Sequence, residues 1–227
     1  MRLSVFALVC LSLTACATRE KGRERISFNK EWRFALTEKQ ANASAPDTDD
    51  SNWRVLNLPH DWSIEADFSL DNPATPGGGA LPGGMGWYRK HFKLSESDKG
   101  KVIYIDFDGV YRNSRVWLNG HLLGFRPNGY VSFRYDLTPY LNYGKEENVL
   151  VVQADNSDQP NSRWYSGSGI YRNVWLVKTG QVHVDNWGTN ITTPVMNADK
   201  STVEIETTLK NEASDVTVEV STLIQDK

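Results

Sequence analysis

Short apolar runs, many of them alternating with polar residues, follow one another from Ile26 onward and are separated by turn residues. Alternation with a period of two is typical of strands, and helical periodicity is scarce over the same region. The pattern predicts an all-β sandwich. Its expected strands are Trp32–Leu36, Tyr88–Leu94, Val102–Phe107, Arg115–Leu118, His121–Phe125, Val131–Tyr135, Val149–Asp155 and Val174–Val177.

Turn residues place the connections between these strands. Asn119-Gly120 separates two of them, and because both residues tolerate positive φ, it predicts a two-residue hairpin turn. Two longer loops are expected: Ala41 to Ser51 is small, polar and acidic, and Pro73 to Gly86 is rich in Gly and Pro. The best helix candidate, Leu137 to Leu141, is short enough to be a single turn.

A domain boundary is expected near Thr179-Gly180, so that residues 26–179 form the first sandwich. Beyond it, residues 203–209 and 216–220 alternate between apolar and polar, and each run predicts a half-buried strand. We interpret residues 180–227 as the opening strands of an immunoglobulin-like domain, which needs about 100 residues to be complete. The chain is therefore expected to be the N-terminal part of a longer protein.

The first residues have the features of a targeting segment. Arg2 supplies a positive charge, and Leu3 to Leu13 is almost wholly apolar but too short to span a bilayer. Leu13-Thr14-Ala15-Cys16 resembles the bacterial lipobox, in which the cysteine is lipidated. This predicts a lipoprotein signal peptide at 1–16, a lipidated Cys16, a tether at 17–25, and a membrane-anchored protein of the bacterial envelope, periplasmic or on the outer-membrane surface. An ordinary secretory signal is the alternative.

Composition narrows the chemistry. Cys10 and Cys16 are the two cysteines, so cleavage before Cys16 together with acylation of Cys16 would leave no free thiol and no disulfide. A net charge of −3 over 227 residues favours no nucleic-acid partner. The four histidines lack ligand spacing and no Gly-rich phosphate loop leads into a helix, so we expect neither a metal nor a cofactor. Eight Trp, nine Tyr and eight Phe fit a β protein with exposed aromatic contacts.

Residues 161–176 combine aromatic, basic and small side chains in a turn that leads into an apolar strand. Aromatic faces beside a guanidinium and amides suit a polyol ring. Further motifs precede this stretch in a fixed order: Phe28–Phe34, Leu58–Trp62, Gly86–Lys90, Phe107–Val110, Val116–Gly120, Tyr135–Thr138 and Val151–Asn156. Together they resemble the sugar-binding domain of glycoside hydrolase family 2, the family of β-galactosidases, β-glucuronidases and β-mannosidases, and most of all its exported β-galactosidase-like branch.

The resemblance implies a galactose-binding-like jelly-roll sandwich, then an immunoglobulin-like domain and a (β/α)8 barrel. It implies a retaining exo-glycosidase acting on terminal β-galactosides, with an acid/base and a nucleophilic glutamate on the barrel. Those glutamates are expected beyond Lys227, so no catalytic residue is assigned here; Glu146-Glu147 is interpreted as a solvated turn. The expected partners are an oligosaccharide substrate, the chain's own downstream barrel and a lipid anchor; a homo-oligomer is left open.

Three groups are candidate substrate-binding residues, because in the family loops of this domain line the sugar pocket. The first is His60, Asp61 and Trp62: a carboxylate accepts hydrogen bonds from hydroxyls, an imidazole donates one, and an indole stacks on a pyranose. The alternative is that His60 and Asp61 fix the loop while Trp62 belongs to the core.

The second group, Asp155 and Asn156, ends an apolar strand, where the alternative is an Asx turn. The third is Arg163 and Trp164, with Arg163 either bonding a sugar hydroxyl or bracing a nearby aspartate. Arg172 is expected to make a structural ion pair. Two other functions are weighed against the glycosidase: a lipid-anchored carbohydrate-binding module without catalysis, and a sandwich that serves only in assembly.

Overall fold

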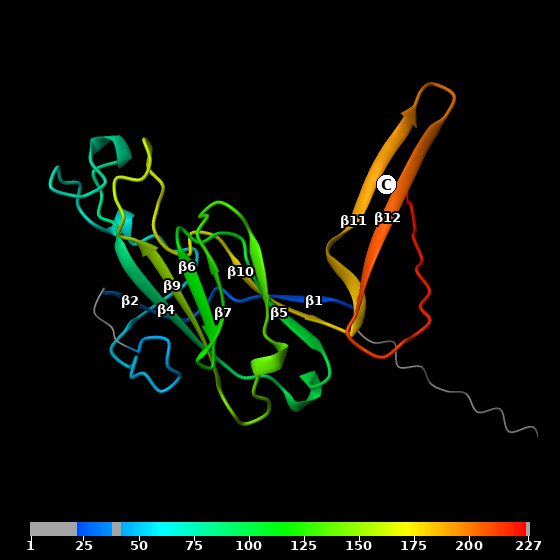
Figure 1. The fold of residues 1–227 in the computed structure, drawn as a ribbon, viewed down its shortest axis with the longest axis horizontal. Coiled ribbons are helices and arrows are strands. Elements are labelled where there is room, and N and C mark those ends of the chain that lie inside the picture. Colours follow the sequence, from blue (N-terminus) through cyan, green and yellow to red (C-terminus); the bar gives the residue numbers. More distant parts are fainter. Residues whose placement is uncertain (1–21, 38–41, 226–227) are drawn as a thin grey trace, which may run out of the picture.

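The computed structural model describes residues 22–37 and 42–225. The strands of its first part are β1 Glu24–Ser27, β2 Trp32–Leu36, β3 Arg54–Leu56, β4 Gly84–Phe92, β5 Val102–Phe107, β6 Ser114–Leu118, β7 His121–Arg126, β8 Phe133–Asp136, β9 Asn148–Asn156 and β10 Val174–Thr179. They form a six-stranded sheet in the order β3-β2-β4-β9-β6-β7 and a four-stranded sheet in the order β1-β10-β5-β8 (Figure 1). This confirms the predicted all-β sandwich.

The N-terminal predictions are only partly covered by the described residues. The signal peptide at 1–16, with Cys16, and the first part of the tether at 17–25 lie outside them. Glu24 and Arg25, the last two tether positions, belong instead to β1 and pair with Lys178 and Val177 of β10. The sandwich therefore begins at Glu24, two residues before the start that the apolar pattern indicates, because these residues pair with β10. Within the described part of the chain, no helix is long and apolar enough to cross a membrane.

The core lies between the two sheets, where alternate side chains of facing strands meet. Trp32, Tyr88 and Leu150 reach it from the six-stranded sheet and are fully buried. Ile103 and Phe107 reach it from β5 in the other sheet and are equally buried. Alternation therefore identifies which side chains of each strand build the core.

Strand β5 is apolar on both faces, as its sequence predicts. Its outward-facing residues Val102 and Tyr104 pack with Val177 of β10 in a small cluster on the outer side of the four-stranded sheet. Tyr104 also contacts the ring of His183, with ring centroids 5.9 Å apart. A strand buried on both sides needs apolar residues at every position, which explains the uninterrupted run.

The predicted turns are observed, except that the loop expected at Pro73 to Gly86 ends earlier, where β4 begins at Gly84 and pairs with β9. Asn119 and Gly120 have φ values of 50° and 83° and connect β6 to β7, as a two-residue hairpin turn requires. The helix candidate at 137–141 is a single 3-10 turn, Thr138–Tyr140. Three further 3-10 turns occur at Ser63–Glu65, Pro76–Gly78 and Glu96–Asp98.

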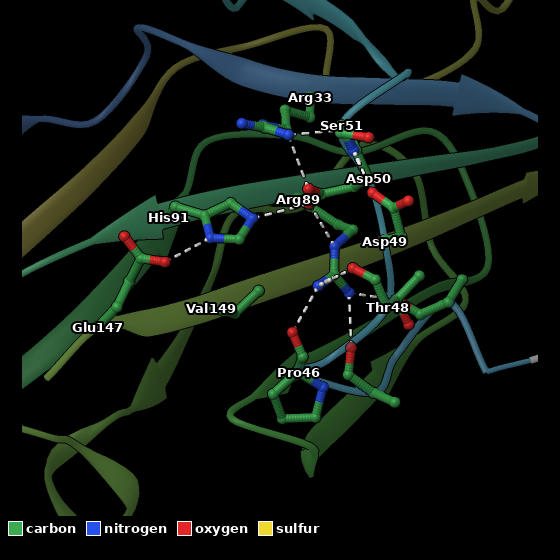
Figure 2. A network of polar contacts seen from close by, with 12 residues as sticks. Arg33, Pro46, Thr48, Asp49, Asp50, Ser51, Arg89, His91, Glu147 and Val149 are labelled. Carbon is green, nitrogen blue, oxygen red and sulfur yellow. Dashed lines mark hydrogen bonds and ion pairs between the residues drawn. The ribbon is translucent and has the colours of Figure 1, made fainter.

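Arg89 fastens the loop at residues 42–50 to the outer face of the six-stranded sheet (Figure 2). Its side chain is fully buried, and its Nε donates to Asp50 Oδ2 at 2.7 Å. Its Nη1 donates to the carbonyl oxygens of Ala43 and Ala45 at 2.7 and 2.8 Å, and its Nη2 to that of Pro46 at 3.0 Å. This part of the predicted loop is therefore held by a buried guanidinium.

The carboxylate of Asp50 also contacts two further side chains of this network, Arg33 and His91 (Figure 2). Arg33 Nη1 donates to Oδ1 at 2.8 Å, and His91 Nε2 lies 2.7 Å from Oδ2. His91 Nδ1 is in turn 2.9 Å from a carboxylate oxygen of Glu147. Burial raises the pKa of Asp50, but the hydrogen bonds from His91 and Arg89 outweigh it and leave the pKa below its usual value.

The second part of the chain is a two-stranded antiparallel sheet, β11 (Val182–Met196) with β12 (Ser201–Asn211). β12 confirms the strand predicted around 203–209. The prediction of a strand at 216–220 is wrong. Residues 216–220 form no strand, because no described segment pairs with them through ladder hydrogen bonds. The assignment of residues 180–227 to an immunoglobulin-like domain stays a prediction.

Candidate functional site

Loops from distant parts of the sequence meet at the end of the sandwich where β4 begins and β9 ends (Figure 1). The segment after β3 joins the segment after β9 through the backbone N–H of His60, which donates to the carbonyl of Ile170 at 2.9 Å. Tyr111, after β5, exchanges two backbone hydrogen bonds with Gly169 at 2.8 and 2.9 Å. These bonds assemble one loop cluster, and the seven predicted substrate-binding residues lie on two stretches of the chain, residues 60–62 and residues 155–164.

Asp61 and Asn156 come together around Ser168. Asp61 Oδ1 accepts the backbone N–H groups of Ser168 at 2.9 Å and Ser63 at 3.0 Å. Asn156 Nδ2 donates to Ser168 Oγ at 2.8 Å, and Asn156 is 1% exposed. Asp61 Oδ2 accepts the hydroxyl of Tyr165. Because these partners occupy both Asp61 oxygens and the Asn156 amide, both residues brace the loop cluster.

His60 and Trp62 are buried in this structure. His60 makes hydrogen bonds that hold the loop, and Trp62 packs in the core, as the alternative interpretation expects. His60 Nδ1 lies 2.7 Å from Tyr88 Oη, and its Nε2 lies 3.3 Å from a Glu65 carboxylate oxygen. Burial lowers the pKa of His60, although Glu65 acts in the opposite direction. Trp62 is 3% exposed and its Nε1 donates to the carbonyl of Gly83 at 3.0 Å. Both rings are therefore largely buried, and Trp62 lines a pocket together with Arg54 and Glu65.

Asp155 forms the Asx turn that the sequence left open. Its Oδ1 accepts the backbone N–H of Ser157 at 3.1 Å and the Ser157 hydroxyl at 2.6 Å. The residue is half-buried, and no hydrogen bond of its Oδ2 is seen within the described part of the chain. A carboxylate oxygen therefore stays open to a hydroxyl at the end of β9.

An aromatic rim, which we define as Tyr130, Trp164 and Tyr165, forms the exposed part of the site. Their exposed fractions are 56%, 61% and 42%. Trp164 Nε1 donates to Tyr130 Oη at 3.2 Å, which joins the segment after β7 to the segment after β9. Exposed aromatic faces next to hydroxyl groups suit stacking on the C–H face of a pyranose, with hydrogen bonds at its edge.

Tyr165 links the rim to the braced loops. Burial raises the pKa of Tyr165, and its hydrogen bond to Asp61 raises the pKa further. The phenol therefore stays protonated at neutral pH and donates to the carboxylate. The ring position is fixed by this bond, so the rim is preorganised on one side.

Arg163 does not brace an aspartate. It is exposed, and no ion pair joins it to a described residue. Asp158 pairs instead with Arg112, 3.1 Å away. The guanidinium of Arg163 is thus available beside Trp164, as a residue that selects between sugars would have to be.

Tyr130 is the residue that the sequence analysis missed. It follows Asn128-Gly129, a turn signal that could have marked an exposed aromatic. A Cβ at Gly129 would come within 2.2 Å of the Tyr111 ring, so the turn requires glycine there.

Glu147 forms an ion pair with His91 and is itself exposed, in line with the solvated turn expected at Glu146-Glu147.

Comparison with known proteins adds to this geometry. Residues 26–180 match the profile of the glycosyl hydrolases family 2, sugar binding domain. The chain is 54% identical over 217 residues to the β-galactosidase BoGH2A of Bacteroides ovatus, covering 94% of this chain and 25% of that protein. It is 30% identical over 211 residues to a β-glucuronidase of Formosa agariphila, covering 84% of this chain and 21% of that protein.

Among solved structures, the fold is similar to that of a β-glycosidase from Bacteroides vulgatus, with a TM-score of 0.80 and 42% identity. The similarity covers 85% of this chain and 25% of the other. The chain thus spans about a quarter of the length of these relatives.

Proposed function

Because the chain belongs to glycoside hydrolase family 2, we propose that it is the N-terminal part of a retaining exo-glycosidase that hydrolyses terminal β-galactosides. The observation that carries the proposal is the aromatic rim, which stands exposed on a loop cluster braced by Asp61 and Asn156. The 54% identity to a β-galactosidase favours galactose over the other sugars of the family.

In this proposal the chain binds and orients sugar, and the downstream barrel supplies the two glutamates of the retaining mechanism. Trp164 stacks on the terminal pyranose while the open oxygen of Asp155 accepts a hydroxyl hydrogen bond. Arg163 donates to a further hydroxyl and contributes to the choice of sugar. Fixing the ring in this way lowers the entropic cost of reaching the reactive geometry.

We also propose that the protein is exported and anchored to the bacterial envelope through a lipidated Cys16. The support is the run Leu13-Thr14-Ala15-Cys16 after an apolar stretch that begins with a positive charge. Labelling cells with a radioactive fatty acid and isolating the protein tests this. Cys16→Ser should abolish the label; a Cys16→Ser protein that keeps it would disprove the anchor.

The test of substrate class is hydrolysis of matched aryl glycosides by the full-length gene product. We expect turnover of the aryl β-galactoside well above that of the β-glucuronide and β-mannoside. The 227-residue chain alone should cleave none of them. Turnover by the chain alone, abolished by replacing one of its own carboxylates, would refute the proposal.

The second candidate function is a carbohydrate-binding module that works without a barrel. It is favoured by the aromatic rim, whose three side chains are exposed in this chain by itself. Calorimetric titration of the chain with galactosides separates the two. Appreciable affinity favours the module. Absence of heat favours a half-pocket that needs its barrel.

A further inference from the structure

A cavity of about 490 Å³ lies against the four-stranded sheet on the side where β11 begins. Its volume falls in the range of about 300–1,000 Å³ that is usual for small-molecule sites. Residues from β1, β5, β8, β11 and the segment before β10 contribute to its walls. The side chains that carry the argument are Arg23, Arg25, Asp106, Arg134, Arg172 and Trp187.

Two of the cavity's arginines are matched by carboxylates. Arg134 donates through Nε and Nη2 to the two oxygens of Asp106 at 2.6 and 2.7 Å. Arg25 stacks on the Trp175 ring at 3.7 Å and lies 3.7 Å from an oxygen of Asp108. These pairs hold two guanidinium groups in place on the sheet.

The other two arginines leave an excess of positive charge. Arg23 Nη2 donates to backbone carbonyl oxygens, those of Val184 and Asp185, which do not neutralise it. Arg172 is exposed, and the ion pair expected for it is wrong: no carboxylate of the described residues lies within ion-pair distance. The cavity therefore has more guanidinium groups than carboxylates, in a chain whose net charge is −3.

Trp187 adds an aromatic wall. Its side chain is 87% exposed, and its φ of +57° is a backbone conformation that bulky residues rarely adopt. It lies where the pairing of β11 and β12 is interrupted, between Val184 and Thr189. A bulge re-aims the side chain it carries, and here the indole becomes part of the cavity lining.

We propose that this cavity binds an anionic saccharide, a pyranose ring that carries a carboxylate or sulfate group. A guanidinium is planar and donates two parallel hydrogen bonds to an oxyanion, which suits Arg172 and Arg23 to the charged group. The Trp187 indole stacks on the ring, and Asp108 Oδ1, which lies 3.7 Å from Arg25, accepts a hydrogen bond from one of its hydroxyls. A neutral sugar would leave the excess charge unmatched.

The test is an NMR titration of the 227-residue chain that follows its tryptophan indole N–H signals, with Trp187→Phe assigning the signal of Trp187. Glucuronate and galactose 6-sulfate distinguish the two oxyanions, and galactose is the neutral control. We expect at least one anionic sugar to shift the Trp187 signal in a saturable way, while galactose does not. The Trp164 signal reports on the rim separately, so a failed cavity and a failed rim give different results.

Variants locate the charge. Arg172→Ala should weaken binding about tenfold or more, the loss expected for a charge-assisted hydrogen bond, and Arg172→Lys should weaken it less. Arg115→Ala removes the same charge from β6 in the other sheet and should leave binding unchanged. The proposal is overturned if no anionic sugar shifts the Trp187 signal, if acetate binds as tightly as glucuronate, or if Arg172→Ala binds like the unaltered chain.

Discussion

Asp50 is the residue on which an otherwise irregular loop depends. Its carboxylate contacts Arg33, Arg89 and His91, and it is 5% exposed. The composition of residues 41–51 predicts a solvated loop, because the run is small and acidic. The partner that buries Asp50, Arg89, is separated from it by 39 positions, so no local pattern reveals the pair.

Removing this carboxylate should strongly destabilise the sandwich. Asp50→Ala leaves Arg89 buried without its counter-charge, and breaking a buried pair on one side costs about 3–5 kcal/mol. Urea unfolding at neutral pH measures the free energy. Asp49→Ala is the matched control, since that side chain is exposed and should have a small effect; equal losses for both variants would contradict the role of Asp50.

The same carboxylate predicts a pH dependence. A folded-state pKa below the usual value gives stability that is present above the unfolded pKa of about 4 and lost as pH falls through the folded pKa. The difference in unfolding free energy between the unaltered chain and Asp50→Asn should therefore shrink as pH is lowered below about 4. A difference that stays constant over that range would show that the fold does not lower the pKa of Asp50.

The site residues were predictable to different degrees. Asp61 and Asn156 were predicted to contact the substrate, which stays a prediction, and the fold brings the two side chains together around Ser168. Whether they touch sugar or brace loops depends on partners such as Ser168 and Tyr165, which only the fold brings to them. The exposure of Tyr130 has a local signal in Asn128-Gly129, but its contact with Trp164 spans 34 residues and is brought about only by the fold.

At the scale of elements, the loop cluster depends on glycine at position 169. Gly169 has a φ of +118°, and a Cβ there would lie 2.2 Å from Tyr88 Oη and 3.0 Å from the His60 carbonyl oxygen. Gly169→Ala should therefore lower the unfolding temperature more than Gly100→Ala. Gly100 also has positive φ, at +85°, but a Cβ meets nothing within 4 Å. Equal shifts in calorimetry would show that backbone strain alone matters.

Strands of the sandwich follow from alternation and apolar runs, but the short β1 and β3 do not. Each contains mostly exposed residues, as in Glu24 and Arg54, and exists because a neighbouring strand supplies ladder hydrogen bonds. The run at 216–220 is the reverse case, because it alternates but has no paired strand among the described residues. Pairing is a property of the fold, which local pattern cannot report.

The hairpin of β11 and β12 should be far less protected than the sandwich. A two-stranded sheet is marginally stable in water, and the apolar residues Ile191 and Val203 of this one are exposed. In hydrogen–deuterium exchange, amides of β11 and β12 should exchange much faster than those of β4 and β9. Comparable protection in both parts would mean that the hairpin is stabilised by more than its own pairing.

At the scale of the whole molecule, the chain presents two candidate sites of different character. The aromatic rim lies on loops that are held by hydrogen bonds, such as that from the Tyr165 hydroxyl to the Asp61 carboxylate. The cavity beside β11 is instead lined by more guanidinium groups than carboxylates. The first agrees with the family to which the chain belongs. The second was not foreseen, since it brings together Arg23, Arg172 and Trp187 from three separate segments.

The central claim is that the rim of this domain contacts the sugar of a family 2 glycosidase. The most direct measurement is kcat/KM of the full-length gene product for an aryl β-galactoside, with and without Trp164→Ala. We predict a loss of about tenfold or more with an unchanged unfolding temperature, because an exposed stacking ring acts on the substrate and not on the fold. An unchanged kcat/KM in the folded variant would contradict the claim.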